Sequence, residues 1–324
     1  MSELDLSQVQ FGEETAWGTP VAGTAKLMGV LEASVQPMTE VHIPEKELRG
    51  SLAPGYQAAL KAISGKGRLA LEMTYEDPLF IVEGAFGEDA PSGAGPYTRD
   101  YVAPVVVGTS PTPRFHTFIY GDPDGVYKLD GAFPAGFDIE ASSNEISKIT
   151  ADYLGKRVES GALAALSDRT VVPLMGDHWA LFIDAWAGTI GTTAVATTAL
   201  SFKLGVKLNY ALKKYLGSLT PGGVRKPRWS GELSLRYEFN AVSKAYIDDI
   251  VAATAVHQKQ IRLKATQGTN VFQIDYAGVA VGDPKIFDDE EGSAAVEVKY
   301  VPLYNPTLAN WLKLQSVNGL AALP

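Results

Sequence analysis

Residues 50–55 read "GSLAPG" and residues 217–222 read "GSLTPG", so one hexamer occurs twice with a single conservative change. The two copies lie about half the chain apart. Glycine, serine and proline gather at turns in many proteins, so the hexamer alone could be a coincidence. The segments on either side of it decide whether the chain contains an internal duplication.

Strand-like segments flank both hexamers. Upstream, Leu31–Val41 and Phe202–Leu212 alternate apolar and polar residues, and downstream Gly67–Glu76 and Gly231–Asn240 do the same when aligned from their first residues. A period of two is typical of strands with one buried face. Each hexamer is therefore predicted to be a turn that leads into a strand.

Each downstream strand continues into a short helical pattern, at residues 77–87 ("DPLFIVEGAFG") and 243–253 ("SKAYIDDIVAA"). Asp77 and Ser243 are the predicted N-caps, and Gly87 is predicted to end the first helix. The helices thus follow the repeated strands in the same order.

Two more strand-like pairs follow the helices. Tyr127–Glu140 matches Phe272–Lys285, and Ile146–Arg157 matches Ser293–Tyr304. The first copy also holds an insert at residues 87–113 that is rich in proline, glycine and serine, which predicts a long loop. The order of elements is otherwise the same in both halves.

The sequence therefore predicts a mainly β fold, a tandem duplication of an antiparallel β-sandwich or barrel domain, each copy with one packed α-helix. A length of 324 residues suits two domains, and 46% hydrophobic residues are enough for a core. The predicted division is an N-terminal arm at 1–24, a first domain at 25–165, a second domain at 166–305 and a C-terminal arm at 306–324.

Composition excludes several classes of protein. The chain has no cysteine, so it forms no disulfide and no thiolate metal site. Its first 20 residues lack the cationic start and apolar run of a signal peptide. The longest uncharged stretch, residues 185–202, holds five threonines among small residues, which favours strand and turn over a membrane span.

Motifs for catalysis or cofactor binding are missing from the sequence, so we expect no enzyme, no catalytic residue, no cofactor and no metal. The histidines, at positions 42, 116, 178 and 257, are scattered and read as surface or loop residues. There is no GxSxG, GxGxxG or P-loop pattern. The acidic stretches at 121–125 and 288–292 could ligate calcium, but their composition and spacing favour turns.

Charge is unevenly distributed along the chain, whose net charge is −9. Residues 1–165 carry 12 basic and 23 acidic residues, whereas residues 166–324 carry 16 and 14. A basic stretch at 213–229 interleaves cations with aromatic residues, as in nucleic-acid grooves. Because the whole chain is acidic, we favour docking of this stretch on an acidic neighbour.

The segment "ETAWGTP" (14–20), the strand "LMGVLEASVQP" (27–37), a long polar loop and a repeated β-domain resemble the major tail tube proteins of long-tailed, siphovirus-like bacteriophages in their two-copy form. The resemblance implies a structural virion protein, built from tail-tube-like domains, that forms stacked rings around a lumen for DNA ejection. Three two-copy chains would close a pseudo-sixfold ring, assembled in the host cytoplasm. The implied partners are other copies of the chain, tape measure, terminator and tip proteins, and DNA passing through the lumen, with no membrane.

On this interpretation the loop between Val41 and Gly50 and the two arms would bridge successive rings, and the basic stretch would dock on an acidic neighbour. The tryptophans of the arms could instead pack on their own domain. The expected interface residues are Trp17, Pro20, His42, Glu45, Glu47, Lys213, Lys214, Arg225, Lys226, Arg228 and Trp311. The expected equivalent turn residues are Gly50, Pro54, Gly217 and Pro221.

A second class of function stays open from the sequence. A two-domain β-sandwich could bind a receptor or carbohydrate, or decorate a capsid, if aromatic residues gathered on one exposed face. Trp179 and Trp186 are the candidates for such a face, although packing in the strand core suits them better. A hydrolase would need paired carboxylates in a cleft, which sequence alone does not supply.

Overall fold

The computed structural model describes residues 6–43, 57–106, 112–195, 199–251, 256–290 and 293–323. Within these ranges the fold is mainly antiparallel β, as predicted. The helices are α1 (Pro78–Phe86), α2 (Ala241–Val251) and a short 3₁₀ turn, η2 (Gly176–His178).

The strands fall into two sequential sets. The first set is β1 (Gln8–Glu13), β2 (Ala25–Lys26), β3 (Val30–His42), β4 (Ala59–Glu72), β5 (Tyr97–Val102), β6 (His116–Asp122), β7 (Gly125–Ser142), β8 (Lys148–Gly155) and β9 (Arg157–Ser160). The second set is β10 (Trp179–Ala185), β11 (Ala194–Val195), β12 (Ala199–Lys207), β13 (Ala211–Lys213), β14 (Gly223–Arg225), β15 (Ser230–Glu238), β16 (Gln258–Gln267), β17 (Asn270–Glu290), β18 (Ser293–Pro302) and β19 (Leu312–Asn318).

The first set pairs in the order β3-β4-β8-β7. The N-terminal half of β7 then pairs with β6 and β9, and β1 pairs with β6 and β2. All these pairs are antiparallel. The second set pairs in the order β12-β15-β18-β17, with β16 and β19 on the N-terminal half of β17, and β10 between β16 and β11.

The two pairing series therefore correspond strand for strand. Each series also has a register shift at the start of its first long pair, between Val30 and Glu32 in β3 and between Ala199 and Ser201 in β12. β5 has no counterpart in the second series, and the β13–β14 hairpin is separated from β12 and β15 by short breaks.

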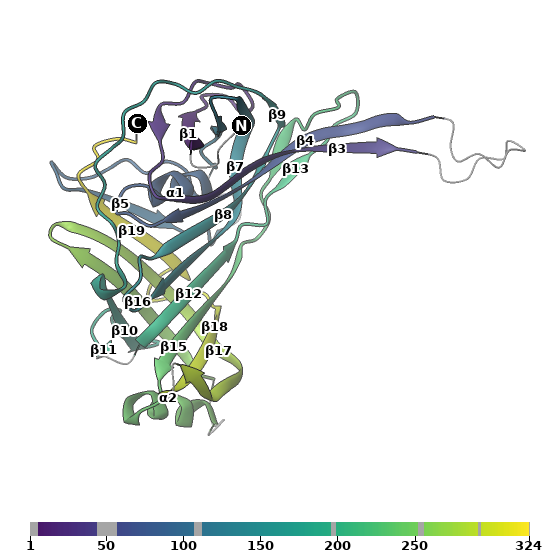
Figure 1. The fold of residues 1–324 in the computed structure, drawn as a ribbon. Coiled ribbons are helices and arrows are strands. Elements are labelled where there is room, and N and C mark those ends of the chain that lie inside the picture. The colour runs from purple at the N-terminus through teal and green to yellow at the C-terminus, as the bar shows by residue number, and fades with distance from the viewer. Residues whose placement is uncertain are drawn as a thin grey trace, which may run out of the picture.

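One strand pair joins the two sets into a continuous sheet. The C-terminal half of β7 pairs with β12 over seven positions, from Gly136 opposite Lys207 to Ser142 opposite Ser201. Figure 1 shows the long strands of both sets crossing the body diagonally, with α1 near one end and α2 at the other.

The two faces of this sheet differ in chemistry because side chains alternate along every strand. Paired residues on one face form apolar rows, and all members of one such row are buried: Leu71, Ile149, Ile139, Leu204, Leu233 and Tyr300. The neighbouring row on the opposite face is polar: Glu72, Lys148, Glu140, Lys203, Ser234 and Lys299.

The two helices pack differently. All nine residues of α1 are buried, and the ring of Phe80 lies 6.1 Å from that of Phe11. In α2, Ser243 and Ile247 are buried, but Lys244 and Asp248 are exposed. The difference follows from sequence, since α1 is apolar on nearly all sides and α2 is not.

The predicted N-cap position is confirmed for Asp77 and is wrong for Ser243. Asp77 occupies the N-cap position of α1 but makes no capping hydrogen bond, because its carboxylate bonds to Thr74 and Arg169. Ser243 lies inside α2, which begins two residues earlier, and its hydroxyl donates to the carbonyl of Glu238 at 2.7 Å. Gly87 ends α1 with a φ of 89°, as predicted.

Three segments that were predicted to be arms or a loop contain strands. The N-terminal arm includes β1, the C-terminal arm includes β19 and the insert at 87–113 includes β5, which pairs with β19. In addition, the downstream alignment was shifted by two residues. Leu69 lies between Ala33 and Ala151 on its neighbouring strands, and Leu235 lies between Phe202 and Val298. By these pairings Leu69 corresponds to Leu235. A two-residue shift keeps every side chain on its face, so the periodicity could not reveal it.

Candidate assembly surface

The continuous series β3-β4-β8-β7-β12-β15-β18-β17 ends, in the described part of the chain, at one open edge on β3 and one on β17. β3 pairs with β4 alone, and β17 pairs with β18 alone from Ala280 onward. β3 also carries exposed apolar side chains, with Leu31 53% and Val41 51% exposed. Unpaired N–H and C=O groups beside exposed apolar residues favour pairing with another chain.

The charged face is the name we give to the polar side of the continuous sheet. It comprises Glu32, Arg68, Glu72, Asp138, Glu140, Lys148, Asp152, Lys203, Lys207, Glu232, Arg236, Asp288, Glu297 and Lys299. Both signs of charge alternate along it, and the net charge is close to neutral.

Ion pairs join four cations of the charged face to neighbouring carboxylates. Arg68 lies 3.5 Å from Glu32, Arg236 lies 3.3 Å from Asp288 and Lys299 lies 3.7 Å from Glu232. Lys203 contacts Glu140 directly and lies 3.8 Å from Asp138. Such half-exposed pairs add little stability, but they cancel much of the attraction that each cation would exert on an anion.

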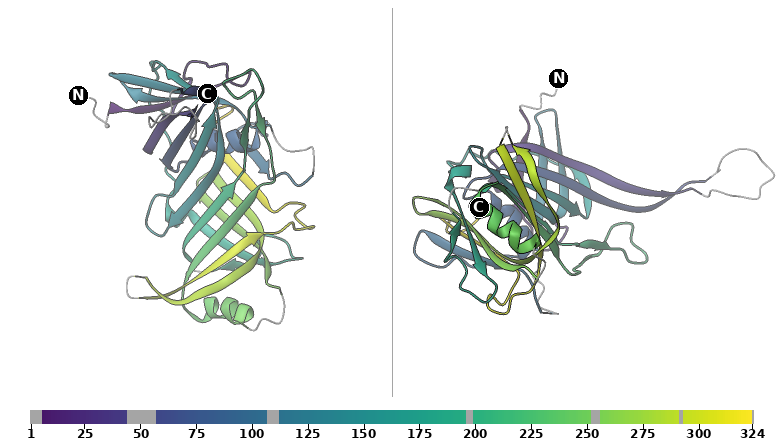
Figure 2. Two further views of the ribbon diagram at one scale, coloured as in Figure 1. Left: turned by 90° about the vertical axis from the view of Figure 1, so that its right-hand side faces the viewer. Right: turned by 90° about the horizontal axis from the view of Figure 1, so that it is seen from below.

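The β3–β4 hairpin extends well away from the body of the molecule (Figures 1 and 2). The loop that follows β13 lies against it. The amide of Ile63 in β4 donates to the carbonyl of Leu219 at 2.8 Å, and Lys214 forms an ion pair with Glu40 of β3. The loop with the second hexamer therefore rests on the first set of strands.

A pocket of about 490 Å³ opens beside β14 and the end of β18. Its walls include Trp229, Trp311 and Tyr304, and Lys226 and Arg228 contribute the cations. The amine of Lys226 donates to the hydroxyl of Thr112 at 3.1 Å. Burial and the nearby charge of Lys213 lower the pKa of Lys226 from its ordinary value.

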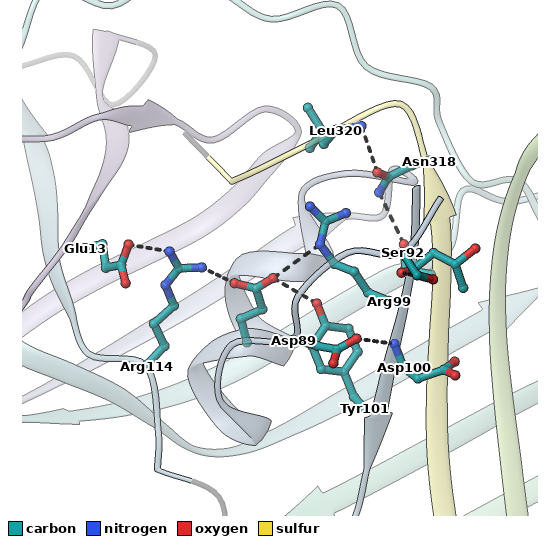
Figure 3. Close-up of polar contacts among 12 residues, drawn as sticks. Glu13, Asp89, Ser92, Arg99, Asp100, Tyr101, Arg114, Asn318 and Leu320 are labelled. Carbon is teal, nitrogen blue, oxygen red and sulfur yellow. Dashed lines mark hydrogen bonds and ion pairs between the residues drawn. The ribbon is translucent and has the colours of Figure 1, made fainter. Parts of the chain in front are cut away.

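A buried ionic network joins β1, α1 and β5 (Figure 3). The carboxylate of Glu83 in α1 pairs with Arg114, accepts from the hydroxyl of Tyr101 at 2.9 Å and lies 3.6 Å from Arg99. Arg114 also pairs with Glu13 at the end of β1. Burial raises the pKa of Glu83, and the two arginines partly oppose that shift. The network is fixed inside one chain, so its role is structural.

The predicted tryptophan contacts are made within the chain. Trp17 donates its indole N–H to the carbonyl of Gly131 at 3.0 Å, and its ring lies 6.2 Å from Phe115. Trp311 is only 8% exposed. Both side chains therefore pack on their own subunit, which the sequence had left as an alternative to the interface. Pro20 is half-buried in the same loop as Trp17.

The basic stretch is on the surface. Lys213, Lys214, Arg225 and Arg228 are exposed, and Lys226 is half-buried. His42 is exposed at the end of β3. Gly217 has a φ of 81° and open space around it, while Pro221 is buried. Glu45, Glu47, Gly50 and Pro54 lie outside the described residues.

His116 does not lie on the surface as predicted. It is 2% exposed, and its ring lies 5.3 Å from that of Phe11. Burial, with a further contribution from Arg114, lowers its pKa to about 4. The sequence offered a signal, because His116 begins the apolar run "HTFIY" of β6.

A second tryptophan loop was missed in the sequence. "AWAGT" at 185–189 follows β10 as "AWGT" at 16–19 follows β1. A buried carboxylate anchors each loop: Glu14 accepts from the amides of Gly18 and Gly131, and Asp184 accepts from those of Gly191 and Thr193. The repeated Ala-Trp pair could have extended the internal alignment.

The features required by other functions were also sought in the structure. Trp179 packs against Phe202 with ring centroids 4.8 Å apart and bonds to Ser147, so it belongs to the core. Among the described residues no group of three His, Asp or Glu could hold a metal ion. No helix in these ranges is long and apolar enough to cross a membrane.

Comparison with known proteins gives one family. A family model described as phage tail tube protein matches residues 5–302, which span strands β1 to β18 and both helices. The search of curated proteins gave no match. The match covers most of the chain, and the mainly antiparallel β architecture with its open strand edges agrees with it. This chain therefore belongs to the phage tail tube protein family.

Proposed function

We propose that this chain is a tandem duplication whose copies close into trimeric, pseudo-sixfold rings, and that the rings stack into the tail tube through which DNA is ejected. Family membership already gives the protein a structural role in the virion tail. The observation that carries the rest is the β7–β12 pair, which joins two sets of strands with matching pairing order.

The pairing registers identify which edges would meet between copies. β3 and β12 each have a register shift near their start, and when these two shifts are superposed Ser34 of β3 corresponds to Lys203 of β12. In the first set Glu140 pairs with Lys148 of β8, and in the second set Asp288 pairs with Ala295 of β18. Lys148 and Ala295 occupy equivalent positions, so Glu140 corresponds to Asp288. The free edges of β3 and β17 are thus the counterparts of β12 and β7.

Ring closure would repeat between chains the joint already present within one chain. Glu140 lies opposite Lys203 in the β7–β12 pair. The corresponding contact places Asp288 of one copy opposite Ser34 of the next. Head-to-tail contacts of this kind form rings when the rotation closes, and a closed barrel leaves no sheet edge exposed.

The charged face would line the lumen. The opposite face of the sheet carries buried apolar rows in both sets, so the charged face is the exposed side of the sheet. Every phosphate neutralised by a free cation would add affinity and therefore friction. Cations held by neighbouring carboxylates would let DNA slide.

Assembly in the host cytoplasm would give tubes that contact the tape measure along the lumen and terminator and tip proteins at the ends. These partners follow from the proposed tube rather than from any described contact. The parts of the two predicted arms that lie outside β1 and β19 would bridge successive rings.

A cross-linking experiment tests ring closure. The chain has no cysteine, so Ser34→Cys with Asp288→Cys introduces the only thiols. Oxidation of assembled protein should give covalent trimers that electron microscopy shows as rings. The matched control, Glu140→Cys with Lys203→Cys, should link within one chain. A control that links while the test pair stays monomeric would refute this ring.

A further inference from the structure

The two hairpins that carry the hexamers occupy corresponding positions. The register of β3 and β4 ends with His42 opposite Ala59, and β13 pairs with β14 from Ala211 opposite Arg225. The offset in residue number that relates β3 to β12 also relates His42 to Ala211. The offset that relates β4 to β15 also relates Ala59 to Arg225. The loop at 214–222 therefore corresponds to the sequence at 45–56.

In one chain, the loop of the second set covers the first set. Leu219 accepts the hydrogen bond from Ile63, just beyond the point where the β4–β8 pair ends. On the neighbouring positions Ala62 is 4% and Ser64 is 6% exposed. The loop therefore takes the place of a continued strand next to β4.

The corresponding surface of the second set is open. Ile63 matches Trp229, and Ala62 and Ser64 match Arg228 and Ser230, by the register of β4 and β15. Arg228 and Ser230 are exposed, and the 490 Å³ pocket opens beside Trp229. Within the described part of the chain, where Pro104, Val105 and Val106 also line the pocket, no loop takes the position in the second set that the 214–222 loop takes in the first.

We propose that this pocket receives the 45–56 loop of the neighbouring subunit in the same ring, so that the "GSLAPG" hexamer docks between subunits as "GSLTPG" does within one. The inference rests on the proposed ring, in which the next subunit's first set stands beside this second set. The chain's own loop belongs to β3 and β4, at the far edge of the sheet from the pocket.

The chemistry of the pocket suits that occupant. Leu52 matches Leu219 and would meet the aromatic walls made by Trp229 and Trp311. Glu45 matches Lys214 by the offset that relates β3 to β12, so the occupant brings a carboxylate to a rim that carries Lys226 and Arg228. Within the chain the charges are reversed, because there Lys214 meets Glu40. Opposite charge patterns at the two joints would keep each loop on its own site.

Cysteine pairs test the docking separately from ring closure. Leu52→Cys with Arg228→Cys, treated with a short thiol cross-linker after assembly, should give covalent dimers and trimers that go no further. Ala62→Cys with Leu219→Cys should link within one chain and controls for the reagent. Single-cysteine variants should give no oligomer with closed-ring stoichiometry.

Each other outcome overturns a defined part of the argument. Ladders that continue past the trimer would place the loop in an adjacent ring and overturn the docking. An unlinked Leu52/Arg228 pair would also overturn it, provided that Ser34→Cys with Asp288→Cys still gives trimers. If neither pair links between chains, the ring itself fails, and the docking fails with it.

Discussion

Arg99 and Glu83 are a buried ion pair, 1% and 2% exposed at their side chains, that holds β5 against α1. Buried pairs add little over apolar residues of the same size, but removing one partner leaves an uncompensated charge. Removing one member of the network should therefore lower the free energy of unfolding by more than the intact network contributes to it.

Glu83→Leu should lower the free energy of unfolding by about 3–5 kcal/mol, because Arg99 and Arg114 lose their carboxylate. Denaturant unfolding followed by circular dichroism measures the change. Adding Arg99→Met should recover part of the loss, since the buried cation is then gone. The exposed pair Lys244–Asp248 is the matched control, where Lys244→Ala should cost at most about 0.5 kcal/mol.

His116 makes stability depend on pH. The pKa of His116 is about 4 in the folded chain and near 6.5 in the unfolded chain. Between pH 4 and pH 6.5 this histidine is therefore protonated in the unfolded chain but not in the folded chain. The free energy of unfolding should therefore fall by up to roughly 3 kcal/mol as the pH drops from 6.5 to 4. His116→Phe should remove this contribution to the pH dependence of stability. The unfolding midpoint of the variant should then vary less with pH than that of the original protein. Equal slopes in both proteins would contradict the assignment.

At the scale of elements, β1 is an integral strand and not an arm. It pairs with both β6 and β2, and Val9 and Phe11 are each 1% exposed. The apolar burial of those two residues alone is worth about 1.5–3 kcal/mol each. The strand also supplies Glu13 to the buried network.

Deletion of residues 1–13 should therefore abolish folding, whereas an arm could be removed without loss. Soluble yield and far-UV circular dichroism provide the measurement. Deletion of residues 1–5, which precede the described chain, is the control and should leave a folded protein. A folded 1–13 deletion that merely fails to stack would restore the arm interpretation.

Sequence alternation predicted most of the long strands because it determines the face on which each side chain lies, and α1 was predicted from Asp77 before it and Gly87 at its end. It could not predict β5, whose six residues lie among prolines and glycines and gain their structure from pairing with β19. Nor could it identify the β7–β12 joint, since alternation determines a strand's face but not its neighbour. Docking of the basic stretch on an acidic neighbour stays a prediction, and the pocket beside this stretch depends on Trp311, 82 positions beyond Trp229 in the chain.

At the scale of the whole molecule, the charged face combines nearly equal numbers of both charges and ties several cations to carboxylates. A lumen lined in this way would hold DNA weakly without repelling the strands from one another. The weak binding of DNA depends on the ion pairs of the charged face, so DNA should bind more tightly when the carboxylates of these pairs are neutralised.

Asp138→Asn with Glu140→Gln should release Lys203 and increase the retention of DNA by assembled tubes. Co-sedimentation of short duplex DNA at several salt concentrations measures this effect, and the salt dependence should steepen by about one counterion for each phosphate contacted. Asp168→Asn, which releases Lys26 away from the charged face, is the matched control. Equal retention in all three proteins would show that the charged face does not meet DNA.

The β7–β12 joint has a further consequence for how a tube would grow. In a ring of three chains, half of the six lateral joints are made as each chain folds, at the high effective concentration of a tether. Only three encounters then pay the translational entropy of association, instead of six. On the proposed duplication, fusion would also free the two halves to diverge, so that one could keep a long hairpin and the other a short one. A ring of six identical subunits has no such division of labour.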